Sequence, residues 1–110
     1  MDANYASSLN ELGRFEETKS LMRRQMPVAQ RVLGEGHEIT LKMRWIYAQS
    51  FYMNDSATLD DLRKAVTTLE DTERTARRVL GGAHPITVDI GLTLQRARAG
   101  LRAREASRSV

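Results

Sequence analysis

Cysteine is absent from this chain of 110 residues. Its absence excludes disulfide bonds, thiol catalysis and thiolate metal sites, so the fold does not depend on an oxidising compartment. No apolar run approaches the roughly 20 residues that span a bilayer, and no signal-peptide pattern follows Met1. We therefore expect a soluble, cytoplasmic protein, or a piece of a larger intracellular one, without a membrane span.

Aromatic residues are also scarce, at 5%, and only two prolines occur, whereas alanine, leucine and arginine are plentiful. This composition favours packed helices over a sheet, which uses more aromatic and β-branched residues. The hydrophobic fraction of 41% and the charged fraction of 28% argue against global disorder. We therefore expect an all-α fold that forms a single domain over residues 1–105.

Positive charge is concentrated at the C-terminal end. Residues 1–95 carry 12 basic and 13 acidic side chains, whereas residues 96–110 carry five arginines against a single glutamate. Such a helix would either bind nucleic acid or an acidic membrane in a salt-sensitive way, or present a polar outer face that ends a stack of helices. We favour the second interpretation and expect no nucleic-acid partner. The arginines are Arg96, Arg98, Arg102, Arg104 and Arg108.

One sequence motif occurs twice in the chain. VLGEGHEIT at residues 32–40 returns as VLGGAHPIT at residues 79–87, which is 47 positions later. This period lies in the range of helical-pair repeats, whose units stack because none of them buries its apolar face alone. The motif therefore indicates a repeat architecture, but it does not identify a ligand.

Five helices are predicted from periodicity and end signals, at about 3–12, 15–33, 38–53, 58–80 and 85–104. Glycines follow three of them, at Gly13, Gly34 and Gly81. Pro27 removes one backbone hydrogen bond, and we expect it to bend or split the second helix. The connections are short, so successive helices should be antiparallel neighbours, and residues 106–110 should fray.

The sequence LGRFEE at residues 12–17, VLGEGH at 32–37 and RRVLGGAHPIT at 77–87 resembles tetratricopeptide repeats of the kinesin-light-chain type. The resemblance covers about residues 4–100 and implies a right-handed α-α superhelix of antiparallel helical hairpins. It divides the chain into a first repeat at about 3–36, a second at about 37–83 and a closing helix at 84–105. The chain departs from the pattern in a longer connection at 54–58 and in Glu38, which stands where proline is usual.

His37 and His84, the two histidines, occupy equivalent repeat positions. They would serve as metal ligands or bases, or each would cap a turn between repeats. We favour the caps, because neighbouring turns should lie about 10 Å apart, too far for one metal ion. The adjacent acids at 16–17 and 60–61 point about 100° apart on a helix, and no phosphate-binding loop or hydrolase motif occurs. We therefore expect no enzyme activity, no cofactor and no metal.

A stripe on the predicted helix 38–53 is the best candidate for a binding site. At helical spacing it places one cation, two aromatic rings and an amide on the face that would line the concave side. Such groups offer large contact areas and adaptable hydrogen bonds, which suit a peptide or helix of a partner protein. In the alternative interpretation, Trp45 and Tyr52 belong to the core. The stripe consists of Lys42, Trp45, Gln49 and Tyr52, and equivalent positions on the flanking helices are Ser7, Asn10, Asp89 and Arg96.

The predicted function is therefore a non-enzymatic protein-interaction module or scaffold. A second hypothesis is self-association into a homo-oligomer or within a longer repeat array, because two and a half repeats leave apolar ends exposed. Sequence alone identifies neither the partner nor the oligomeric state.

Overall fold

The computed structural model describes residues 3–108, with side chains through residue 107. Within this range the chain forms five α-helices and no strand, so the all-α prediction is confirmed. The fifth helix continues to residue 108, so the predicted end near residue 104 is wrong, and residues 109–110 of the tail expected to fray lie outside the described range. The helices are α1 (Ala3–Glu11), α2 (Phe15–Val32), α3 (Glu38–Tyr52), α4 (Leu59–Leu80) and α5 (Pro85–Arg108).

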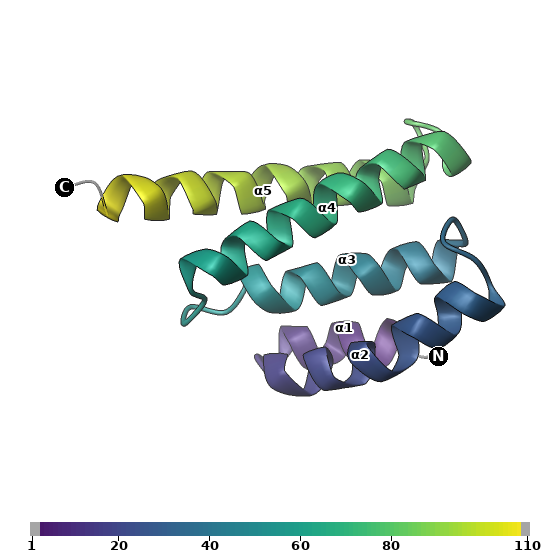
Figure 1. Ribbon diagram of the computed structural model, residues 1–110, viewed down its shortest axis with the longest axis horizontal. Coiled ribbons are helices and arrows are strands. Elements are labelled where there is room, and N and C mark those ends of the chain that lie inside the picture. The colour runs from purple at the N-terminus through teal and green to yellow at the C-terminus, as the bar shows by residue number, and fades with distance from the viewer. Residues whose placement is uncertain (1–2, 109–110) are drawn as a thin grey trace.

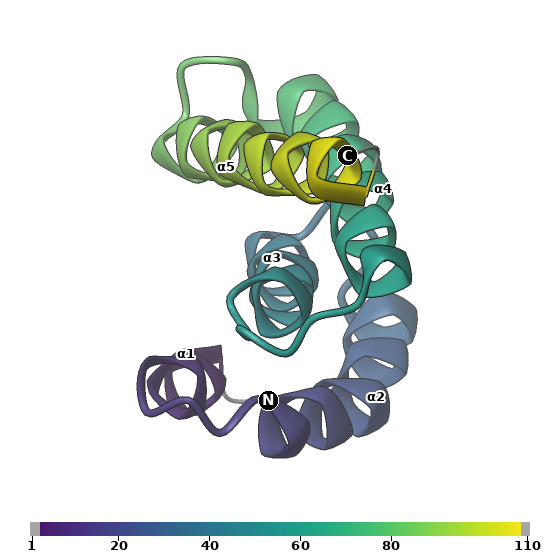
Figure 2. The same cartoon turned by 90° about the vertical axis from the view of Figure 1, so that its left-hand side faces the viewer.

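The helices form two layers (Figures 1 and 2). Figure 2, which looks along the long axis, shows α1, α3 and α5 on one side and α2 and α4 on the other. The connections alternate between the two ends of the molecule, so successive helices run antiparallel (Figure 1). The central helix, α3, packs against each of the other four. This arrangement places the first helix of every hairpin in one layer.

The helix ends follow from local chemistry. Gly34 and Gly81, which end α2 and α4, have φ angles of +95° and +92°, a conformation that favours glycine. The start of α4 is fixed by a capping box, in which Thr58 and Asp61 each accept a hydrogen bond from the other's backbone N–H. Pro27 lies inside α2, but the helix continues without a break, so the predicted split does not occur.

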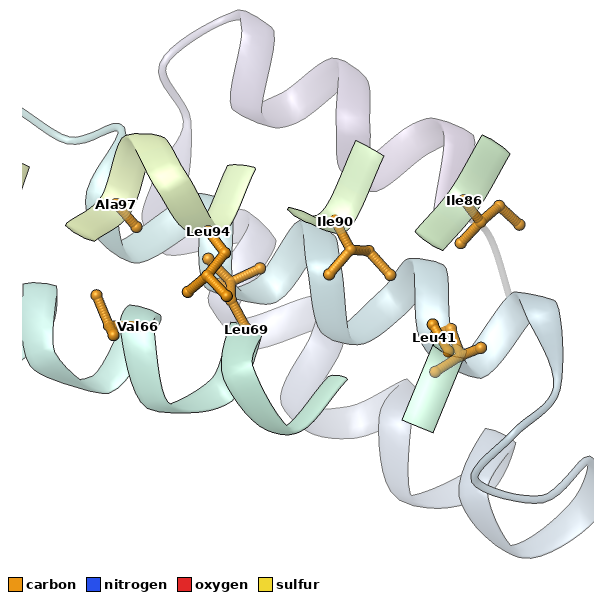
Figure 3. Packing of buried hydrophobic residues seen from close by; sticks show 9 residues of the cluster. Leu41, Val66, Leu69, Ile86, Ile90, Leu94 and Ala97 are labelled. Carbon is orange, nitrogen blue, oxygen red and sulfur yellow. The ribbon is translucent and has the colours of Figure 1, made fainter. Parts of the chain in front are cut away.

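The core lies on both sides of α3. One cluster joins α3 to α1 and α2 and includes Met22, Met43 and Ile46. A larger one joins α3 to α4 and α5, and in Figure 3 the α5 side chains lie over those of α4 and α3. Burying a leucine or isoleucine side chain stabilises the fold by about 1.5–3 kcal/mol, so these clusters explain why α3 holds the two layers together. The labelled members are Leu41, Val66, Leu69, Ile86, Ile90, Leu94 and Ala97.

Candidate functional site

Both histidines cap a helix, as the sequence predicts. The Nδ1 atom of His37 accepts a hydrogen bond from the N–H of Ile39 at 3.1 Å, at the start of α3. The Nδ1 atom of His84 accepts one from the N–H of Ile86, also at 3.1 Å, at the start of α5. A ring nitrogen that satisfies a first-turn N–H is committed to the backbone. The repeated sequence therefore forms the same turn and capped helix start twice, at residues 34–40 and 81–87. We call each of these segments a corner.

The two corners are in contact. The Nε2 atom of His84 lies 3.3 Å from Oε1 of Glu38, the residue that replaces proline after His37. Gly36 has no side chain, and a Cβ atom there would lie 2.8 Å from Cγ2 of Val79. The glycine therefore allows the end of α4 to approach the first corner closely. In the part of the chain that the structure describes, no group of three His, Asp or Glu side chains lies close enough to hold a metal ion.

The predicted stripe begins with exposed Lys42 and half-buried Trp45 on α3. The Trp45 ring packs against the larger core cluster, and its Nε1–H donates to Oγ1 of Thr93 on α5 at 2.8 Å. A buried indole N–H needs such a partner, so this bond fixes the orientation of the ring. Trp45 is therefore a bridge between two helices of the same layer, with part of its ring open to solvent.

Tyr52, at the end of the stripe, also lies between α3 and α5. It packs against the same core cluster and remains half-buried. Burial raises the pKa of its phenol, because the charged phenolate would lose solvation, while the charge of Arg96 and hydrogen bonds from Thr93 and Arg96 oppose that rise. The structure therefore places Arg96 of α5 beside Tyr52 of the predicted α3 stripe, and Thr93 of α5 beside both Trp45 and Tyr52.

The other predicted residues differ in exposure. Gln49 and Ser7 are half-buried, and Asp89 is exposed. Asn10 does not belong to the open surface, because it is only 4% exposed and its Nδ2 donates to the carbonyl of Ile46 at 3.1 Å. This bond joins α1 to α3, while Oδ1 of the same amide is buried without a hydrogen-bond partner among the described residues. Its burial corrects the expectation that it faces a partner.

The adjacent acids are engaged individually. Asp61 belongs to the capping box, and the hydrogen bond from the N–H of Thr58 lowers the pKa of its carboxyl group. Asp60 lies 3.5 Å from Arg63. In α2, a carboxylate oxygen of Glu16 lies 3.2 Å from Nζ of Lys19, and Glu17 pairs with Arg14 at 2.6 Å. Each acid has its own partner, and neither pair converges on a common point.

Sequence reasoning missed a cleft of about 400 Å³ between α4 and α5, which we call the α4–α5 cleft. Its wall on α4 carries Glu73 and Arg77, and its wall on α5 includes Val88 and Leu92. These two apolar side chains are 45% and 47% exposed. The 47-residue period could have revealed the cleft, because it aligns α5 with α3, whose corresponding face is covered.

No helix within the described residues combines the length and apolarity needed to cross a membrane. Comparisons with protein-family models, with curated proteins and with solved structures found no match to this chain.

Proposed function

We propose that this chain is a non-enzymatic protein-interaction module of the tetratricopeptide type, made of two helical hairpins and a closing helix. In this proposal, the outer surface of the layer formed by α1, α3 and α5 binds a peptide segment or helix of a partner protein. We call this surface the first-helix face and define it by Ser7, Lys42, Trp45, Gln49, Tyr52, Asp89 and Arg96.

One observation carries the proposal. Trp45 and Tyr52 pack against the larger core cluster, and a hydrogen bond to Thr93 of α5 holds the Trp45 ring, yet both residues remain partly exposed to solvent. Both lie in the layer that contains α3 and α5 (Figure 2). Rings held in one orientation lose little conformational entropy on binding, which is why anchored aromatic residues are frequent hot spots of interfaces.

The surrounding groups suit an extended peptide. Lys42 and Arg96 supply positive charge, Asp89 supplies negative charge, and Gln49 offers both a donor and an acceptor. A surface of mixed sign with one amide between two rings recognises backbone amides and a charged side chain, whereas a nucleic acid requires a continuous basic surface. The face therefore supports a protein partner.

The histidines and the adjacent acids support the non-enzymatic part of the proposal. Both histidines use Nδ1 as a helix cap, and the acids of each pair have separate partners. A general acid or base must lie within reach of a substrate proton while a second group stabilises the developing charge. These residues make structural bonds instead.

The test begins with peptides selected by display on the wild-type chain and then titrated by calorimetry. Trp45→Ala would remove core packing as well as the exposed ring, so Gln49→Ala and Lys42→Ala separate binding from stability. We expect each to weaken the selected peptide by about fivefold or more, because interface hot spots cost upward of about 1 kcal/mol. The matched control is Lys64→Ala, an exposed lysine on α4 in the other layer.

The test is completed by measuring which backbone amides of this chain change their NMR chemical shifts when the peptide binds. The proposal requires that the perturbed amides lie on α1, α3 and α5. Perturbations confined to α2 and α4, or equal losses for Lys42→Ala and Lys64→Ala, would overturn it.

A further inference from the structure

A buried hydroxyl of α5 has hydrogen bonds with both aromatic rings of the first-helix face. Thr93 is only 3% exposed, and its Oγ1 atom accepts the Nε1–H of Trp45 at 2.8 Å. Its second bond, to the phenol oxygen of Tyr52, favours the charged phenolate, so Thr93 is the donor there. A threonine hydroxyl has one hydrogen to donate and two lone pairs that accept, so this one side chain makes both bonds without conflict.

The equivalent position of α3 carries no hydroxyl. The 47-residue period aligns Thr93 with Ile46, which is 5% exposed and belongs to the core cluster that joins α3 to α1 and α2. An apolar side chain is therefore sufficient for packing at this position. Burying a hydroxyl lowers stability unless the hydroxyl is hydrogen-bonded, so the two bonds to the rings are what distinguishes Thr93 from its counterpart.

The bond to Thr93 uses the only polar atom of the Trp45 side chain. An indole has one N–H donor and no acceptor, so nothing on this ring is left to bond to a polar group of a partner. The part of the ring that is open to solvent is therefore apolar. The polar neighbours on the same face of α3 are Lys42, three positions before Trp45, and Gln49, four positions after it.

We infer that Thr93 is a positioning residue of the first-helix face, and that by holding the indole N–H it makes Trp45 an apolar subsite for one aliphatic side chain of the partner peptide. This inference rests on the proposed function and adds the chemistry of one peptide position to it. Backbone amides of the peptide on either side of that position bond to Gln49 or Lys42 instead. An amide or hydroxyl side chain placed on the ring would lose its hydrogen bonds to water and find none there, so the subsite rejects it.

Two substitutions at position 93 separate the hydroxyl from the packing. Thr93→Val keeps the shape of the side chain and removes the hydroxyl, whereas Thr93→Ser keeps the hydroxyl. The matched control is Thr72→Val, because Thr72 is also completely buried but its hydroxyl donates to the carbonyl of Thr68 within α4. Circular dichroism establishes that each variant is folded before it is used.

The first two measurements need no peptide. In Thr93→Val the indole N–H of Trp45 should exchange with solvent about tenfold faster than in the wild-type chain, as measured by NMR, because it has lost its acceptor. The pKa of Tyr52 should rise further in the same variant, since the bond from Thr93 opposes its rise. Thr93→Ser and Thr72→Val should leave both quantities unchanged.

The third measurement uses the peptide selected on the wild-type chain. Nuclear Overhauser effects from the indole ring identify the peptide residue that contacts Trp45. Two peptides are then made with leucine or asparagine at that position, since these side chains are similar in shape and differ in polarity. On the wild-type chain we expect the leucine peptide to bind about tenfold or more tightly than the asparagine peptide.

The ratio of the two affinities is the decisive quantity. In Thr93→Val the indole N–H is free to bond to the asparagine, so the ratio should fall to about threefold or less. Thr93→Ser and Thr72→Val should keep the wild-type ratio. A general loss of stability or of affinity changes both peptides alike and cancels in the ratio, so a purely structural role of Thr93 would not move it.

The outcomes distinguish this inference from the proposed function. If a peptide binds the first-helix face but Thr93→Val changes neither the indole exchange nor the affinity ratio, this inference is wrong and the proposed function stands. Preference of the wild-type chain for the asparagine peptide also overturns the apolar subsite. If no peptide binds the face, the proposed function fails and the apolar subsite fails with it, while the indole exchange and the pKa of Tyr52 still decide whether Thr93 holds the two rings.

Discussion

In the first hairpin, α1 and α2 meet through a tight turn at Gly13, whereas in the second, α3 and α4 are joined by the connection at residues 53–58. Arg14 precedes α2 and provides no side-chain cap in the described structure, but the N–H of Arg14 donates to the carbonyl of Leu9 at 2.8 Å. Before α4, Thr58 and Asp61 form the capping box. One turn relies on backbone conformation and the other on side-chain hydrogen bonds, although both hairpins end in the same corner.

The two hairpins also differ in how much of each is covered. Among residues 3–108, the first helix of the first hairpin, α1, contacts only α2 and α3, whereas α3 contacts all four other helices. A repeat array is stabilised by the interfaces between neighbours, so an end unit has fewer of them than a central one. We infer that opening of the structure begins at α1, and each prediction below tests or refines that contrast.

The largest expected effect comes from the central core. Leu69 of α4 is completely buried, and Leu69→Ala should lower the free energy of unfolding by about 3 kcal/mol through lost burial and a cavity. Leu9 of α1 is 3% exposed, but Leu9→Ala should cost about half as much, because the end helix can shift to close the cavity. Urea unfolding followed by circular dichroism measures both. Equal losses would show that α1 is as firmly held as α4.

The next effect should raise stability. Pro27 is exposed in the interior of α2 and removes the N–H that would bond to the carbonyl of Arg23. Pro27→Ala should restore that bond and raise the free energy of unfolding by about 1–2 kcal/mol. Thermal unfolding measures the gain, with Arg24→Ala as an exposed control on the same helix. No gain in the free energy of unfolding would mean that α2 already accommodates the proline without cost. The proline would then not contribute to the lower stability that we infer for the first hairpin.

A smaller effect should come from the contact between the corners. Gly36→Ala would place Cβ 2.8 Å from Cγ2 of Val79, so we expect a loss of about 1 kcal/mol. Val79→Ala should remove most of that loss in the double variant, which a double-mutant cycle measures. Gly82→Ala is the matched control, because the nearest atom to its Cβ is an Arg77 nitrogen at 3.7 Å. If the two glycine substitutions cost the same, the corners do not lock the hairpins together.

Most of the helix boundaries could be predicted from the sequence because their causes are local. Glycines at positive φ end α2 and α4, and the Thr58–Asp61 pair starts α4, so short windows of sequence contain the necessary information. The end of α5 is an exception, because residues 101–108 contain no glycine or proline that would mark where the helix stops, and the predicted end near residue 104 is too early. The expectation of fraying at 106–110 rests on their position at the terminus, whereas the helix in fact continues to Arg108.

The exposure of the candidate site could not be predicted in the same way. Asn10 bonds to the carbonyl of Ile46, 36 residues away, and Trp45 bonds to Thr93, 48 residues away. Each bond depends on the rotation of two helices, and one residue of error in register turns a helical face by about 100°. The α4–α5 cleft could not be predicted for a related reason. Whether another helix covers a given face of α3 or α5 depends on how all the helices stack.

The smallest predicted effect is a pKa shift in the second hairpin. Burial raises the pKa of Tyr52 above its ordinary value of 10.0, and the nearby charge of Arg96 opposes that rise. The folded chain therefore keeps the phenol proton in a pH range where the unfolded chain loses it. This contribution to stability is complete below the ordinary pKa, and it is lost as pH rises through the raised folded value.

Ultraviolet titration of the folded chain measures this pKa from the absorbance change that Tyr52→Phe removes. Arg96→Gln should raise it further, because the substitution removes the positive charge that favours the phenolate. Arg102→Gln, an exposed arginine farther along α5, is the matched control and should leave it unchanged. If neither substitution moves the pKa, Arg96 does not reach the phenol in solution. The contact between Tyr52 of α3 and Arg96 of α5 would then be weaker in solution than in the structure.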